Sequence, residues 1–72
     1  MRKIDLKNVV WKEGRYCVSW NLNTGVSSFG ETKKESLDAL REALELHLDG
    51  TSFSKVKKIE KPIIASFIFR HA

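Results

Sequence analysis

The sequence predicts an α+β domain of order β-β-β-α-β, an antiparallel sheet with one helix packed on one face. Alternating apolar and polar residues up to residue 29 predict the first strands. Residues 32–50 are amphipathic with helical spacing, and residues 63–69 form a β-branched and aromatic run. The chain has 72 residues and no linker or repeat, so we expect a single domain over residues 1–72.

Three strands are expected before the helix. Residues 4–11 alternate as a strand, and Gly14 supplies a positive φ for a hairpin loop of three or four residues. One face of the next strand carries Tyr16, Val18, Trp20 and Leu22, whereas Cys17, Ser19 and Asn21 share the other. Turn formers at residues 21–25 precede a short strand at 26–29, which Gly30 ends. We expect the helix to cover Val18 and Trp20, with at least one tryptophan in the core.

The helix has signals at both ends. Thr32 and Glu35 form a capping box, and Gly50 is placed to end the helix in a left-handed conformation. Between them an apolar stripe recurs at helical spacing, at Leu37, Leu40, Leu44 and Leu48. We expect this stripe to pack on the sheet. A polar and basic connector over residues 51–60 should follow, with a short extended piece around Val56.

Charge is segregated along the chain, although the formal net charge is +4. Residues 31–50 carry six acidic and three basic side chains, whereas residues 51–72 carry one acidic and five basic side chains. Four acidic residues fall together on one side of the helix: Asp38, Glu42, Glu45 and Asp49. Such a row is commonly a solvated helix face, and its functional interpretation is a docking surface for a basic partner.

The thin core of so short a chain favours self-association. Cys17 is the single cysteine, which excludes an intrachain disulfide. Residues 63–69, which follow Pro62, are apolar on both faces of an extended strand, and one helix cannot cover both. We therefore expect a homo-oligomer, a symmetric dimer or a dimer of dimers. Its interface is expected to include Leu46, Ile64, Phe67 and Phe69.

No motif for catalysis or metal binding is present. Cys17, His47 and His71 lack the paired spacing of a zinc site, and nothing in the sequence brings them together as nucleophile and base. We expect no enzyme activity, no cofactor and no metal. The start of the sequence lacks the apolar run of a signal peptide, so none is expected, and no apolar run reaches the roughly 18 residues that a membrane span needs. With the free thiol, this favours a cytoplasmic protein without membrane contact.

Three stretches of the sequence carry a family resemblance: residues 13–16 (EGRY), 30–37 (GETKKESL) and 41–46 (REALEL). They are similar to the hairpin, the G-x-T-x-x-E-A-L helix start and the x-E-A-L-x-L helix end of the HicB family of antitoxins. The resemblance implies a β-β-β-α-β fold similar to part of ribonuclease H. It also implies binding and neutralisation of HicA, a small toxin that cleaves mRNA, by protein–protein contact.

Many HicB members carry a further DNA-binding module. No helix-turn-helix or ribbon-helix-helix pattern follows residues 63–69, so DNA binding is not expected. Two other interpretations stay open. A single-stranded nucleic-acid-binding module is favoured by the pI near 9.5 and by Trp11, Tyr16, Trp20 and Phe29, although the alternation of these aromatics favours core packing. The other is a homo-oligomeric structural protein without a toxin partner.

Overall fold

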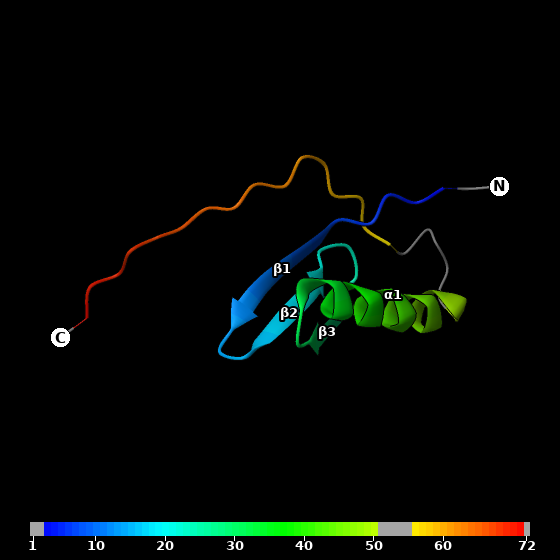
Figure 1. Ribbon diagram of the computed structural model, residues 1–72. Coiled ribbons are helices and arrows are strands. Elements are labelled where there is room, and N and C mark those ends of the chain that lie inside the picture. Colours follow the sequence, from blue (N-terminus) through cyan, green and yellow to red (C-terminus); the bar gives the residue numbers. More distant parts are fainter. Residues whose placement is uncertain (1–2, 51–55, 72) are drawn as a thin grey trace.

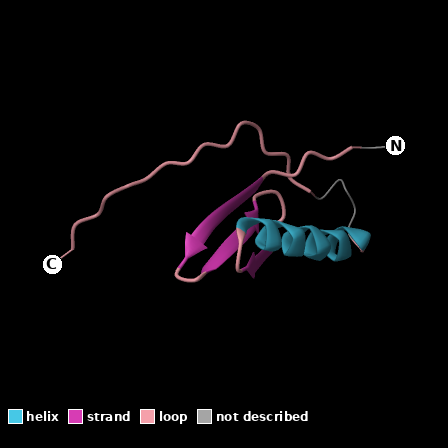
Figure 2. Ribbon diagram, in the orientation of Figure 1, coloured by secondary structure: helices cyan, strands magenta, loops and turns pink. Residues whose placement is uncertain are grey.

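A three-stranded antiparallel sheet and one helix form the body of the molecule (Figure 1). The computed structural model describes residues 3–50 and 56–71. The elements are β1 (Asn8–Glu13), β2 (Tyr16–Asn21), β3 (Ser27–Gly30) and α1 (Lys33–Asp49). β2 lies between the two edge strands β1 and β3, and α1 lies against one face of the sheet (Figure 2). The predicted α+β class is confirmed.

The predicted fourth strand is wrong. Residues 63–69 belong to an extended segment, residues 62–71, which we call the arm and which runs away from the sheet and the helix (Figure 1). Its side chains are exposed, Ile64 to 89% and Phe67 to 83%. A strand requires a neighbouring strand for its backbone hydrogen bonds, so a β-branched and aromatic composition alone does not form one. The order within the described residues is therefore β-β-β-α.

The first hairpin is tighter than predicted. Glu13 pairs with Tyr16, which leaves only Gly14 and Arg15 in the turn instead of three or four residues. Gly14 has a φ of 61°, and the two-residue turns that match the twist of a hairpin need such positive values. The role of the glycine was predicted correctly, and the length of the loop was not.

The chain turns between β2 and β3, as the turn formers predict, and the turn forms around a buried side chain. Asn21 is fully buried, and its Oδ1 accepts hydrogen bonds from the backbone N–H and the hydroxyl of Thr24, both at 2.8 Å. Its Nδ2 donates to Asn8 Oδ1 at 2.8 Å, which ties the turn to the start of β1. The polar groups of Asn21 are thus satisfied inside the protein, which is the condition for burying them.

The predicted helix start is confirmed, and the predicted helix end needs a correction. Thr32 Oγ1 accepts a hydrogen bond of 3.1 Å from the backbone N–H of Glu35, as the capping box requires. The Glu35 carboxylate accepts from the backbone N–H of Glu31, also at 3.1 Å. At the other end, Gly50 has a φ of −106° and is not left-handed. Its N–H donates to the carbonyl of Leu48, which closes the last turn without a left-handed residue.

Helix α1 covers the face of β2 opposite to the predicted one. The covered residues are Cys17, Ser19 and Asn21, all buried, whereas Trp20 is exposed. The helix approaches so closely that a Cβ added at Gly30 would lie 2.6 Å from the backbone nitrogen of Ser36. Small side chains permit this approach, and the bulky aromatics of the other face do not. The expectation that Val18 and a tryptophan lie beneath the helix is therefore wrong.

The apolar core is correspondingly small. Leu40 and Leu44 of the predicted stripe are buried, together with Ser36, which lies one turn before Leu40. Leu37 and Leu48 are only partly covered. Of the predicted connector, residues 51–55 lie outside the described residues.

Candidate binding surface

The sheet face turned away from α1 is lined by aromatic and aliphatic side chains. The strand register places Trp11 opposite Val18, and Val18 opposite Phe29, in one row across β1, β2 and β3. Successive side chains in a strand point to opposite faces, so Tyr16 and Trp20 share this face with Val18. We call Trp11, Tyr16, Val18, Trp20 and Phe29 the aromatic face.

The aromatic face is open to solvent. The exposed fractions are 42% for Trp11, 51% for Tyr16, 41% for Trp20 and 67% for Phe29. Both tryptophans thus lie outside the core, contrary to the sequence prediction. A contiguous apolar patch on a small protein marks a surface that contacts something else.

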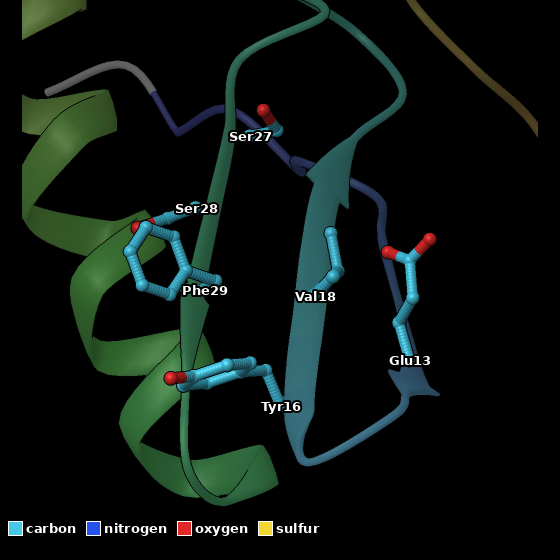
Figure 3. Close-up of a pocket in the computed structure, with 6 residues that line it drawn as sticks. All are labelled: Glu13, Tyr16, Val18, Ser27, Ser28 and Phe29. Atoms are coloured by element: carbon cyan, nitrogen blue, oxygen red, sulfur yellow. The ribbon is translucent and has the colours of Figure 1, made fainter.

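A shallow hollow lies at one end of the aromatic face (Figure 3). Tyr16 and Phe29 stand side by side there in an edge-to-face pair, with ring centroids 6.0 Å apart and an angle of 85° between the rings. Val18, Ser27 and Ser28 also line the hollow, and Glu13 is the one charged residue of the lining. The hollow therefore suits an apolar or aromatic group and disfavours an anion beside Glu13.

The acidic row predicted for the helix is exposed. Asp38, Glu42, Glu45 and Asp49 all lie on α1 away from its buried residues. Asp38 accepts a hydrogen bond of 2.9 Å from the ammonium group of Lys34. This bond, reinforced by the charge of Asp38, raises the pKa of Lys34 above its usual value. Since α1 lies between the row and the sheet, the acidic row and the aromatic face are on opposite sides of the molecule.

The residues predicted for a subunit interface are exposed as well, but one chain does not bring them together. Leu46 is 79% exposed on α1, on the side opposite to Leu37 and Leu48. Ile64, Phe67 and Phe69 lie in the arm, which runs away from the helix (Figure 1). Nothing in the described structure tests their role in an interface, and it stays a prediction.

The groups considered for catalysis and metal binding are scattered. Cys17 is a buried free thiol beneath α1, whereas His71 is exposed in the arm. Within residues 3–50 and 56–71, no group of three His, Cys, Asp or Glu side chains could hold a metal ion. In the same described residues, no helix has the length and apolar character for crossing a membrane.

The comparison with known families assigns the chain to one of them. The match runs from residue 2 to residue 62 and includes the whole sheet and helix α1. The chain belongs to DUF7387, a family of unknown function. The apolar run at residues 63–69 lies beyond the DUF7387 match. No curated protein and no solved structure matches the chain.

Proposed function

We propose that this chain is a partner-binding domain that acts as a HicB-like antitoxin. In this proposal it has no catalytic activity of its own and neutralises a small HicA-like mRNA-cleaving toxin by protein–protein contact. The observation that carries the proposal is the aromatic face, which α1 leaves uncovered. Tryptophan, tyrosine and phenylalanine are enriched at the centres of protein interfaces, where they supply much of the binding energy. The free thiol of Cys17 suits a reducing compartment such as the cytoplasm.

The hollow beside Tyr16 and Phe29 suggests what the toxin presents. An apolar side chain can lie in the hollow against the two rings, and a basic group beside it can pair with Glu13. The acidic row on α1 is the alternative docking surface, because HicA-like toxins act on RNA and need basic residues for that. The two surfaces are on opposite sides, so variants in each distinguish them.

Single-stranded nucleic-acid binding is the second candidate function. Exposed aromatic side chains on an open sheet face can stack on bases, and the aromatic face offers four of them, Trp11, Tyr16, Trp20 and Phe29. The charge at the hollow favours a protein instead, since Glu13 would repel a phosphate backbone there. The lysines at positions 57, 58 and 61 follow the helix and lie outside this face.

An inhibition assay tests the proposal. The proposal requires a neighbouring reading frame that encodes a small basic protein. The product of that frame is purified, and its cleavage of mRNA is measured with and without an equimolar amount of the chain. We expect the cleavage to stop. The double variant Tyr16→Ser/Phe29→Ser should lose this inhibition while its circular dichroism stays unchanged, because both side chains are exposed. The matched variant Glu42→Gln/Glu45→Gln should still inhibit.

Three results would favour another binding surface or another function. Loss of inhibition only in the Glu42→Gln/Glu45→Gln variant would show that the toxin binds the acidic row and not the aromatic face. Binding of single-stranded RNA with a steep dependence on salt, without binding of any protein, would favour the second candidate. A neighbouring toxin that cleaves mRNA equally well in the presence of the chain would overturn the antitoxin proposal.

A further inference from the structure

The arm and the outer edge of β1 are two unpaired surfaces of the same chain. The arm is extended and carries exposed phenylalanine and isoleucine side chains. Among the described residues, β1 is an edge strand whose one partner is β2. Its outer backbone N–H and C=O groups therefore form a template on which a further strand can add.

A groove runs beside this edge, between α1 and the segment before β1. Its lining is mainly apolar, with Ile4 and Leu6 on one side and leucines of α1 on the other, and Asn8, Arg41 and Glu45 also line it. The groove exists because α1 lies mainly over β3 and β2 and hardly reaches β1. Leu37 consequently remains 38% exposed, although it belongs to the apolar stripe of the helix.

The arm fits this edge because it is apolar on both sides. In an extended chain, successive side chains point in opposite directions, so Ile64 and Ile68 face one way and Phe67 and Phe69 the other. A strand added along the outer edge of β1 would lie between two surfaces. The groove lies on one side of the sheet, and the aromatic face, which begins with Trp11 at this edge, lies on the other. The edge thus offers apolar surface to both sides of the arm at once.

The arm is directed away from the groove of its own chain. Asn23 ties Lys57, which precedes the arm, to Lys7, which precedes β1. Its Nδ2 donates to the carbonyl of Lys57 at 2.6 Å, and its Oδ1 accepts from the N–H of Lys7 at 2.8 Å. Lys61 then adopts a φ of 46°, an unusual conformation for a residue before proline, and Pro62 follows. From this bend the arm continues outward (Figure 1).

We propose that the arm of one copy adds as a strand to the β1 edge of a second copy and fills its groove. The exchange is reciprocal, so two copies are related by a two-fold axis. Each buried aromatic ring contributes roughly 150–250 Å², and each arm carries two phenylalanines and three isoleucines. The total area buried by two such arms and by the surfaces that they cover therefore reaches about the 1,200–2,000 Å² that a stable interface buries.

Sedimentation of the full chain at micromolar concentration tests the exchange. We expect twice the 8.3 kDa mass of one chain. Phe67→Glu places a charge in the proposed contact and should weaken the dimer roughly 30-fold or more. Phe67 is 83% exposed within one chain, so the variant should fold normally. Leu46→Glu is the matched control, because Leu46 lies on α1 opposite to the groove, and it should leave the dimer intact.

The other outcomes contradict the exchange. A mass of 8.3 kDa for the full chain would mean that the arm stays free or folds onto its own chain. A dimer that survives Phe67→Glu would exclude the arm from the interface, and a dimer lost only in Leu46→Glu would place the interface on the helix. The two proposals can fail separately, because the inhibition assay uses variants of Tyr16 and Phe29, on β2 and β3, whereas sedimentation uses a variant of the arm and needs no toxin.

Discussion

The Ser19 hydroxyl of β2 donates a hydrogen bond of 2.9 Å to the backbone carbonyl of Ser36 in α1, and both residues are fully buried. This bond joins the central strand to the first turns of the helix. It places the small, polar face of β2 beneath α1 and turns Trp20 of the same strand outward. The open aromatic face thus follows from which side of β2 the helix contacts.

Replacing Ser36 by alanine should leave the protein as stable or stabilise it by up to about 1 kcal/mol. The Ser36 hydroxyl is buried and has no hydrogen-bond partner among the described residues, whereas its carbonyl, which Ser19 contacts, is kept. Alanine removes the unsatisfied hydroxyl and favours the helix. Urea unfolding measures the difference, and a clear loss of stability would show that the hydroxyl has a partner.

Gly30→Ala should destabilise the protein by about 1–3 kcal/mol, the usual cost of overpacking. The new Cβ would lie 2.6 Å from the backbone nitrogen of Ser36 and 2.9 Å from the carbonyl carbon of Glu35, and the helix backbone cannot easily move aside. Gly50→Ala is the control, because a Cβ at Gly50 meets nothing within 4 Å. Equal melting temperatures for the two variants would contradict the close contact between β3 and α1.

Leu44→Ala should cost about 2–5 kcal/mol, as is typical for a buried leucine. Leu44 packs against the sheet, whereas Leu46 on the other side of the helix is exposed, so Leu46→Ala should change stability little. Chemical unfolding of both variants gives the comparison. A near-neutral Leu44→Ala would show that this side of α1 does not form the core.

The purified chain should not cleave RNA. Cys17 is buried beneath α1, and no three metal-binding side chains come together in the described residues, so neither a nucleophile nor a metal centre is presented. Incubation with labelled mRNA fragments and gel analysis tests this. Cleavage that Cys17→Ala or His47→Ala abolishes would refute the assignment as a binding domain.

The local signals of the sequence predicted the first three strands and the start of the helix, whereas the fourth strand and the packing of the faces were predicted wrongly. The capping residue Thr32, the turn at Asn21 and the first three strands depend on neighbouring residues, which the sequence shows directly. Which face of β2 lies beneath the helix depends on contacts between residues that are far apart in the sequence. Hydrophobicity favoured Trp20 for the core, but close packing of α1 on the sheet requires small residues instead.

A usable signal for the covered face was nevertheless present. Ser36 precedes the buried Leu40 and Leu44 at intervals of four residues, and Ser19 occupies the centre of the small face of β2. Together these small residues indicate a close helix–sheet contact. For residues 63–69, the composition indicates a strand but does not identify the neighbouring strand. The sequence therefore could not show with which sheet edge these residues pair, or whether they pair at all.

Quenching of Trp20 fluorescence by acrylamide in the Trp11→Phe variant tests most directly whether α1 leaves the aromatic face open. Trp20 is then the single tryptophan, in the central strand and 41% exposed. With an open aromatic face, we expect efficient quenching and an emission maximum close to that of a solvent-exposed indole in the folded protein. An emission shifted strongly to the blue and resistant to acrylamide would place Trp20 beneath the helix and show that the aromatic face is not open.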